Sequence, residues 1–414
     1  MKYRPFIITL FFVAFLFVGM RTTQTDRNML AALVFPERIT PEELHEKYGA
    51  PGKKINILIV PGHDQEASGT EHGSLRELDL NLALGKHLHT LLEDDDRFRV
   101  FLTQDASGYT PIFEAYFMLQ KNAIKEFIRT FKQLMYTATQ GGFEKKSVVQ
   151  HNAVSKDISL KLYGMNKWAN ENKIDIAVHI HFNDYPGRPW GRVGKYTGFS
   201  IYVPEKQLPN ARASQDVAKS VFVQLKKALP VTNYKKESAG IVEDQELIAV
   251  GSYATLDAAS LLIEYGYIYE SQFNNERIRD DVMKELAYHT YAGLVRYFDP
   301  RANLAAHDTS LLPYQWNDVL ELGDKGEKDV LALQVALNRD GVYPPDGKTF
   351  NDCPLSGNFL TCTKEAVVAF QKKYLGAQMG TGTVGFSTIN ILNKLYGFGN
   401  VVESNFPLYG HETF

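Results

Sequence analysis

Two imidazoles and two carboxylates stand where strand-like or helical segments of the chain begin or end. His63 ends the sequence VPGH after an apolar stretch, and Glu77 opens a segment with helical spacing of apolar residues. His181 and Glu264 each lie in an apolar, strand-like run. Two histidines and one glutamate from separate elements are the usual protein ligands of a catalytic zinc, and a fourth position is left for water. A further glutamate can take the proton from that water, so this combination favours metal-dependent hydrolysis.

The stretch AVHIHFN strengthens this interpretation because strand alternation places His179, His181 and Asn183 on one face. One buried histidine is commonly a core residue with satisfied hydrogen bonds, whereas two in register at a strand end favour a metal or catalytic site. Taken alone, Glu77 is an acid in a first helical turn, where the dipole stabilises it. Glu264 taken alone is a rim residue that faces water. The prediction therefore depends on the combination.

Strand-like runs alternate with helical segments over residues 53–299, and this pattern predicts an α/β domain. The clearest strands are 55–60, 98–103, 174–180, 198–203 and 261–268, and helical spacing is clearest over 77–93, 214–228 and 284–298. We expect a twisted, mostly parallel sheet flanked by helices. The loops after the carboxyl ends of parallel strands bind ligands in such sheets, and His63 lies in one of them.

One inserted segment, residues 110–146, interrupts the alternation with apolar residues at helical spacing. Thr110 and Pro111 suit a helix N-cap and a first helical position. We expect a helix here that packs on the domain. A second hypothesis is that this helix lies near the cleft, where it restricts access or receives a partner.

A smaller all-α domain is expected over residues 318–397, after a linker at 300–317 and before a tail at 398–414. Its three predicted helices are 329–338, 363–374 and 388–396. The domain contains both cysteines of the chain, Cys353 and Cys362, on either side of Gly357.

The first twenty residues differ from the rest of the chain. Lys2 and Arg4 precede an apolar stretch over residues 6–20, which is typical of an export signal, either a cleaved peptide or an uncleaved membrane anchor. Residues 21–52 are expected to be a polar linker. The remaining composition is that of a globular protein, with a net charge of −3. This balance disfavours nucleic-acid binding, which needs a basic excess.

The order of these motifs resembles the zinc-dependent N-acetylmuramoyl-L-alanine amidases, the Amidase_3 family. The matching stretches are ILIVPGH, LRELDLNLALGKHL, VFLTQD, AVHIHFN, GFSIYV and LLIEYGYI. The resemblance implies that His63, Glu77 and His181 are ligands of Zn²⁺ and that Glu264 is the catalytic carboxylate. It also implies hydrolysis of the amide between the lactyl group of N-acetylmuramic acid and L-alanine. Asn183 is a further candidate for orienting substrate.

The sequence departs from the family pattern near the expected site. Asp64 follows His63 where the family usually has glycine, and His179 stands where a serine is usual. Asp64 could reshape substrate entry or compete as a ligand, and His179 could perturb or replace His181. Glu71 and His72 are minor rivals to Glu77 because they lie in the same loop.

The small domain is similar to peptidoglycan-binding domains of the three-helix type. The similarity is carried by the Leu-Gln pair at residues 333–334, the Gly-x-Phe at 357–359 and the Phe-Gln pair at 370–371. Given export, we expect Cys353 and Cys362 to form a disulfide, which stabilises such a loop by up to about 3 kcal/mol.

The sequence as a whole therefore predicts an exported zinc amidase of the cell envelope whose partner is peptidoglycan. Membrane attachment through residues 6–20 stays open, and the sequence identifies no protein regulator. One alternative is a zinc peptidase or deacylase that cleaves another wall bond. The other is a wall-binding scaffold without activity.

Overall fold

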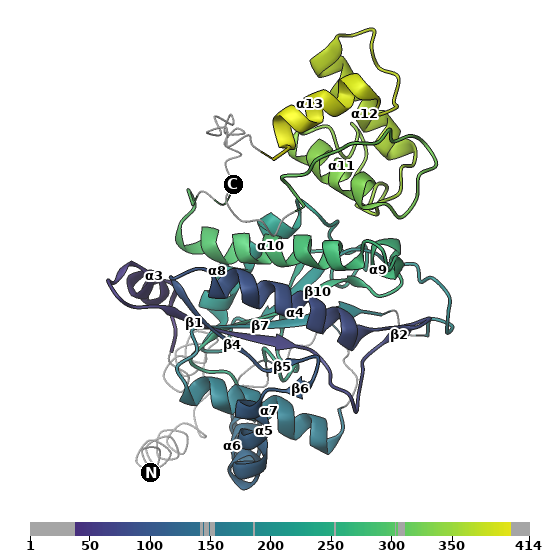
Figure 1. The fold of residues 1–414 in the computed structure, drawn as a ribbon. Helices are drawn as coiled ribbons and strands as arrows, with labels where there is room; N and C mark the ends of the chain where they lie inside the picture. The colour runs from purple at the N-terminus through teal and green to yellow at the C-terminus, as the bar shows by residue number, and fades with distance from the viewer. Residues whose placement is uncertain are drawn as a thin grey trace. The chain divides into compact units, whose positions relative to one another are not determined.

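The chain forms two compact units, residues 1–309 and 310–414 (Figure 1). The computed structural model describes residues 38–398 except 141–143, 145–148, 150–153, 185–186, 252–253, 303 and 305–310. The expected export segment over residues 6–20 lies outside the described residues, as does the tail from residue 399. In the part of the chain that is described, no helix is both long enough and apolar enough to cross a membrane.

The first unit is built on a six-stranded sheet with the strand order β4-β1-β7-β10-β8-β9. Its strands are β1 (Ile55–Pro61), β4 (Phe98–Leu102), β7 (Ile176–Asn183), β8 (Ser200–Pro204), β9 (Ile241–Asp244) and β10 (Ala259–Tyr267). Neighbouring strands are parallel except β8 and β10, which are antiparallel. The predicted α/β fold with a mostly parallel sheet is confirmed. The edge strand β9 has four residues and no apolar run, so the sequence gives little sign of it.

Helices cover both faces of this sheet (Figure 1). One face carries α4 (Glu77–Glu93), α8 (Ala211–Leu225) and α10 (Arg279–Phe298), and the other carries α5 (Pro111–Leu119), α6 (Lys121–Gln140) and α7 (Lys156–Glu171). Gly85 of α4 lies against Pro61 and Ile180, so no larger residue fits there without displacing them. On the opposite face, Trp168 of α7 packs in one cluster with Val60 of β1. Alternate residues of β1 and β7 therefore face different helix layers.

The inserted segment forms two helices, α5 and α6, where the sequence predicts one. Pro111 is at the start of α5 with Thr110 as its N-cap, but the Thr110 side chain makes no capping hydrogen bond. The chain breaks at Gln120, and the buried residues Phe113 and Ile124 on either side of this break pack in two separate clusters. Two helices can cover α7 from different directions, which one straight helix cannot.

A further helix, α3 (Pro41–Gly49), lies within the segment predicted to be a linker. Thr40 caps it in a capping box with Glu43, where each side chain accepts a hydrogen bond from the other residue's backbone N–H at 3.0 Å. Leu44 is buried, and α3 contacts β1 and α8. Residues 40–49 are therefore part of the first unit.

The second unit contains three helices, α11 (Lys328–Arg339), α12 (Thr361–Leu375) and α13 (Phe386–Tyr396). Two buried glutamines hold its turns in the same way. The Oε1 atom of Gln334 accepts hydrogen bonds from the N–H groups of residues 356 and 357, both at 3.0 Å. That of Gln371 accepts from the N–H groups of residues 381 and 382, both at 2.9 Å. The Leu-Gln and Phe-Gln pairs therefore fix two turns of this unit.

The boundary of the second unit differs from the predicted linker at 300–317. Trp316 is only 1% exposed, its indole N–H donates to the carbonyl of Asp329 at 3.0 Å, and its N–H donates to Asn393 at 2.8 Å. The end of the predicted linker is therefore part of the core of this unit.

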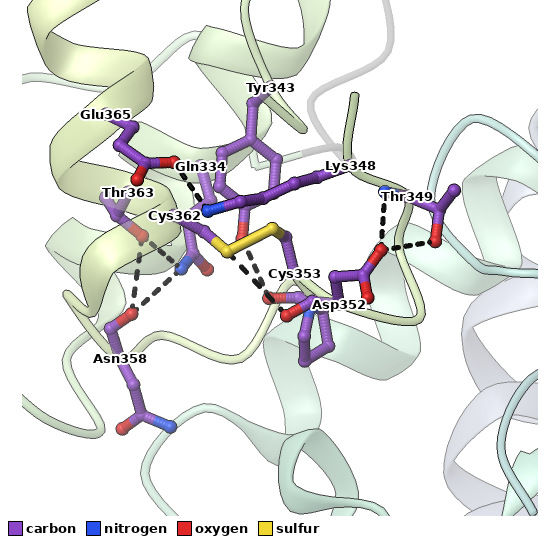
Figure 2. Close-up of a disulfide and its surroundings, with 11 residues drawn as sticks. Gln334, Tyr343, Lys348, Thr349, Asp352, Cys353, Asn358, Cys362, Thr363 and Glu365 are labelled. Atoms are coloured by element: carbon purple, nitrogen blue, oxygen red, sulfur yellow. Dashed lines mark hydrogen bonds and ion pairs between the residues drawn. A yellow bond between two sulfur atoms is a disulfide. The ribbon is translucent and has the colours of Figure 1, made fainter. Parts of the chain in front are cut away.

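Cys353 and Cys362 are joined by a disulfide (Figure 2). The bridge links the loop before Pro354 to the first turn of α12. Near it, the Tyr343 hydroxyl donates to the Pro354 carbonyl at 3.0 Å, and Lys348 pairs with Glu365 at 2.6 Å. These contacts tie the long loop between α11 and α12 to the start of α12.

Candidate metal centre

His63 is held at the carboxyl end of β1 by its own backbone and by a neighbouring side chain. Its φ of 68° is in the left-handed region, which costs energy in a residue other than glycine. The Gln104 amide donates to the carbonyls of Pro61 at 2.7 Å and His63 at 2.5 Å, and the N–H of Gly62 donates to Ile180 at 2.9 Å. These contacts turn the His63 ring toward the end of β7.

Glu77 is the first residue of α4 and is only 4% exposed. Its Oε1 accepts the N–H of Phe182 at 3.1 Å, and its Oε2 accepts the N–H of Thr70 at 3.0 Å. Each oxygen also lies 3.0 Å from an imidazole nitrogen, Oε1 from His181 Nδ1 and Oε2 from His63 Nε2. Burial by itself would raise the pKa of Glu77, but the hydrogen bonds and charges of the two histidines hold that pKa well below its usual range.

The three predicted ligands come together in the structure. One donor atom each from His63, Glu77 and His181 lies within 4.8 Å of the others. Glycines make this approach possible: a Cβ at Gly62 would lie 2.2 Å from the His181 ring, and one at Gly69 would lie 2.4 Å from a Glu77 oxygen. Two imidazoles and one carboxylate are ligands that suit Zn²⁺, so the donor set fits that ion.

Glu264 lies on β10 next to His181 of β7 in the sheet register. Its Oε2 is buried and has no hydrogen-bond partner among the described residues. Burial, together with the negative charges of Glu77 and Glu237, raises the pKa of Glu264 well above its usual range. A half-buried carboxylate with one buried, unpaired oxygen beside the candidate metal ligands is placed to exchange a proton with a bound molecule.

The residues that the sequence offers as alternative ligands lie outside the group formed by His63, Glu77 and His181. Asp64 accepts a hydrogen bond from Lys161 at 2.6 Å, which opposes its burial and keeps the pKa of Asp64 below its usual range. Glu71 accepts from the Ser68 hydroxyl at 3.0 Å, and His72 lies 3.3 Å from an Arg188 nitrogen. These residues are not part of the ligand group in the described structure.

His179 is likewise outside the ligand group, although it lies on the same face of β7 as His181. It is 2% exposed, and burial, with a smaller contribution from the charge of His181, lowers its pKa to about 3. The imidazole is therefore neutral. It lines a cavity of about 400 Å³ that also touches His63 and His181.

Asn183 lies at the end of β7, where its Oδ1 accepts the N–H of Asp184 at 2.8 Å and its amide donates to Glu237 at 3.4 Å. Its role toward substrate stays a prediction. Glu237 itself has no signal in the sequence because it lies in a polar loop. In the structure it is 2% exposed and accepts a hydrogen bond from the Tyr202 hydroxyl at 2.7 Å.

A second network that the sequence does not indicate supports Glu77. Arg188 donates to both oxygens of Asp184, at 2.6 and 2.9 Å. Asp184 also accepts the Thr70 hydroxyl at 2.5 Å, and Thr70 is the residue whose N–H holds Glu77. The loop after β7, which carries Asp184 and Arg188, thus supports the loop before α4. That loop carries Thr70, whose N–H donates to Glu77.

Comparison with known proteins identifies the first unit. Residues 57–296 match the sequence profile of the N-acetylmuramoyl-L-alanine amidase family. A protein of Buchnera aphidicola, named as a candidate N-acetylmuramoyl-L-alanine amidase, is 22% identical over 249 residues, which cover 59% of this chain and 95% of the relative.

Solved structures that are similar include the CwlD amidase from Clostridioides difficile in complex with the GerS lipoprotein. It is 17% identical with a TM-score of 0.40, and the match covers 60% of this chain and 100% of the other. An N-acetylmuramoyl-L-alanine amidase from Clostridium difficile 630 is 19% identical with a TM-score of 0.38, covering 60% and 99%. Because the family match spans more than half of the 414 residues, the protein belongs to the N-acetylmuramoyl-L-alanine amidase family.

Proposed function

We propose that the protein is a zinc-dependent N-acetylmuramoyl-L-alanine amidase that acts on peptidoglycan in the cell envelope. The observation that carries this proposal is the convergence of His63, Glu77 and His181 beside Glu264, whose Oε2 atom is buried and unpaired among the described residues. This is the arrangement that metal-assisted amide hydrolysis needs, in a chain whose family cleaves that amide.

His63, Glu77 and His181 would hold the ion, and their positions are set before it binds. Glu77 is fixed by two backbone N–H groups, and the left-handed backbone of His63 is fixed through Gln104. Zn²⁺, when bound, supplies a Lewis acid that polarises the scissile carbonyl and activates water.

Glu264 would act as the general base and then as the general acid. Its carboxylate accepts a proton from the attacking water and delivers it to the leaving nitrogen of L-alanine. The raised pKa of Glu264 supports this role, because a proton carrier works best when its pKa lies near the working pH. The burial of its Oε2 atom also limits the access of competing water.

Export and wall attachment complete the proposal. A basic, then apolar N-terminal sequence supports export of the chain. The second unit has three helices, with Gln334 and Gln371 holding its turns, and its motifs resemble peptidoglycan-binding domains. It would hold the enzyme on its insoluble substrate and raise the local concentration of scissile bonds.

A direct test uses a soluble N-acetylmuramoyl-L-alanyl peptide and follows the release of the L-alanine amine. We expect release by the zinc-loaded protein and loss of it after chelation. Glu264→Gln should keep its zinc but lose at least about a hundredfold in kcat. Zinc binding without release, while another peptidoglycan bond is cleaved, would favour the peptidase or deacylase alternative. Neither zinc binding nor cleavage, in a folded protein that binds peptidoglycan, would favour the scaffold.

A further inference from the structure

Asp64 is a carboxylate beside the candidate metal ligands that does not belong to the ligand group itself. It follows His63 directly in the chain, and consecutive Cα atoms are only about 3.8 Å apart. His63, Asp64 and His181 also line one cavity of about 400 Å³. Zn²⁺ accepts carboxylate oxygens as ligands, so the placement of the Asp64 side chain decides whether a bound ion has three protein ligands or four.

Four hydrogen bonds occupy the two carboxylate oxygens of Asp64. Its Oδ1 accepts the backbone N–H groups of Glu66 and Ala67, both at 3.0 Å. Its Oδ2 accepts from the Nζ of Lys161 at 2.6 Å and from the Tyr109 hydroxyl at 3.3 Å. The contact with Lys161 is the shortest of the four and joins opposite charges, so it is the strongest of them.

Lys161 of α7 is itself held by this contact. It pairs with Asp64 and also with Glu66, at 2.9 Å from the Glu66 carboxylate. The Glu66 side chain is 78% exposed, so water and salt screen that pair. The Asp64 side chain is 10% exposed, so its pair is screened much less. The Lys161–Asp64 pair therefore fixes both side chains.

We propose that Lys161 is a positioning residue that keeps the Asp64 carboxylate out of the metal site and so leaves one coordination position open. The inference rests on the proposed zinc site and adds a residue that is neither a ligand nor the general base. A catalytic zinc has three protein ligands and one position for water, whereas a fourth protein ligand gives the closed form of structural zinc sites. Lys161 would thus preserve the open form.

The other partners of Asp64 show why the lysine matters. The two backbone N–H groups and the Tyr109 hydroxyl are neutral, so Lys161 supplies the positive charge among these contacts. A carboxylate that is mostly buried and loses its counter-ion pays a large desolvation cost. A divalent cation bound at the neighbouring His63 would offer Asp64 a new counter-ion. We therefore expect Asp64 to bind the ion when the charge of Lys161 is removed.

The test measures the open coordination position in the full chain, with Co²⁺ as a visible probe in place of Zn²⁺. Acetohydroxamate, a small anion that binds metal ions through its oxygens, should bind the wild-type Co²⁺ protein and change its visible absorption. Lys161→Met removes the charge and keeps the length of the side chain. This variant should bind acetohydroxamate at least about tenfold more weakly, because Asp64 occupies the position. Its affinity for Co²⁺ should not fall, because it gains a ligand.

A double variant separates this effect from a general loosening of the loop. Asp64→Asn keeps an oxygen that can accept the N–H groups of residues 66 and 67, but it removes the charge that favours metal binding. Lys161→Met/Asp64→Asn should therefore bind acetohydroxamate within about threefold of the wild-type protein. Lys161→Arg keeps the positive charge and should also retain wild-type binding.

Lys167 provides a matched control on the same helix. Its side chain is 14% exposed, it pairs with Glu171, and it donates to the Tyr116 hydroxyl at 3.1 Å. Neither Lys167 nor these two partners line the cavity. Lys167→Met should keep wild-type acetohydroxamate binding, so the loss of a lysine from α7 is separated from the loss of the contact to Asp64.

Two results would overturn the inference and keep the zinc site. One is equal acetohydroxamate binding by the wild-type protein and Lys161→Met, and the other is a wild-type Co²⁺ protein that binds no acetohydroxamate. Weaker binding that Asp64→Asn does not restore, with a loss of Co²⁺ affinity, would give Lys161 a role in loop stability instead. Should circular dichroism show that Lys161→Met does not fold, Lys161→Gln makes the same comparison.

Failure of the proposed function gives different results. A wild-type protein that binds no Co²⁺ would overturn the proposed zinc site and this inference with it. Metal and acetohydroxamate binding as expected, in a protein that cleaves no amide, would overturn the amidase activity and support the role of Lys161.

Discussion

At the scale of single residues, Glu77 is the centre of the site because four groups fix its two carboxylate oxygens. Two are backbone N–H groups, from Thr70 and Phe182, and two are the imidazoles of His63 and His181. Backbone donors cannot rotate away, so the carboxylate keeps its orientation whether or not the imidazoles turn. A metal ion that binds here meets a ligand that is already oriented, which lowers the entropic cost of binding.

The close approach of Gly62 to His181 makes a sharp prediction at this scale. Gly62→Ala introduces a Cβ that would lie 2.2 to 2.7 Å from three atoms of the ring, so the imidazole must move. We expect zinc affinity to fall by about tenfold or more, measured by competition with a chromophoric chelator. Gly49→Ala is the control, since nothing lies within 4 Å of its Cβ position. Equal zinc affinity in both variants would show that His181 is not confined as described.

Much of the site could be predicted from the sequence because its residues follow strands or open a helix at recognisable motifs. The VPGH and AVHIHFN sequences place His63 and His181, and the structure brings both to Glu77. The burial of Glu237 could not be predicted, because it depends on which distant elements pack around the residue, and no local spacing records that.

At the scale of elements, the loop after β7 supports the loop that precedes α4 through Arg188, Asp184 and Thr70. Arg188→Leu removes the two-pronged contact that holds Asp184, the residue that accepts the Thr70 hydroxyl. We expect zinc affinity to fall by about tenfold, because residues that support a ligand typically contribute that much. Arg192→Leu, at an exposed arginine nearby, should leave it unchanged. Unchanged zinc affinity in Arg188→Leu would show that the loop after β7 does not support the loop before α4.

The helices of the inserted segment are expected to be integral to the first unit. Phe113 of α5 is 1% exposed, and its ring centroid lies 4.8 Å from that of Trp168 in α7. Phe113→Ala should lower the free energy of unfolding by about 3 to 5 kcal/mol, measured by chemical denaturation. Met118→Ala, at a side chain 71% exposed on the same helix, should change it by less than about 0.5 kcal/mol. A small effect at Phe113 would mean that α5 is only loosely attached.

The disulfide makes a prediction for the second unit. Cys353 and Cys362 are nine positions apart, and a closed loop of that size is expected to stabilise its unit by about 3 kcal/mol. Reduction should therefore lower the unfolding temperature of this unit. Thiol labelling of the denatured, unreduced protein should find no free thiol, and two labelled thiols would contradict the bridge.

The elements that could be predicted from the sequence are those with a strong apolar period. The helix over residues 77–93 has the predicted bounds, and β1, β4, β7, β8 and β10 lie within three residues of theirs. The break at Gln120 and the burial of Trp316 were not predicted. The position of the break depends on the surface of α7 against which the two helices pack. The burial of Trp316 depends on helices that follow it in the sequence.

At the scale of the whole molecule, three features of the chain support the proposal that its substrate lies outside the cell. A basic, apolar N-terminus is typical of export, the first unit belongs to a family of wall amidases, and the second unit resembles wall-binding domains. The net charge of −3 leaves no general attraction to a polyanion, so the proposed binding to the wall would depend on specific contacts. The proposed zinc site, with Glu264 beside it, is the part of this account on which the rest depends.

Mass analysis of peptidoglycan digested by the zinc-loaded protein tests that claim most directly. We predict free stem peptides that begin with L-alanine, together with glycan strands that keep their N-acetylmuramic acid. These products should be absent with Glu264→Gln, which keeps the proposed metal ligands His63, Glu77 and His181. Peptides cut at any other bond, or the same products from Glu264→Gln at the wild-type rate, would contradict the account.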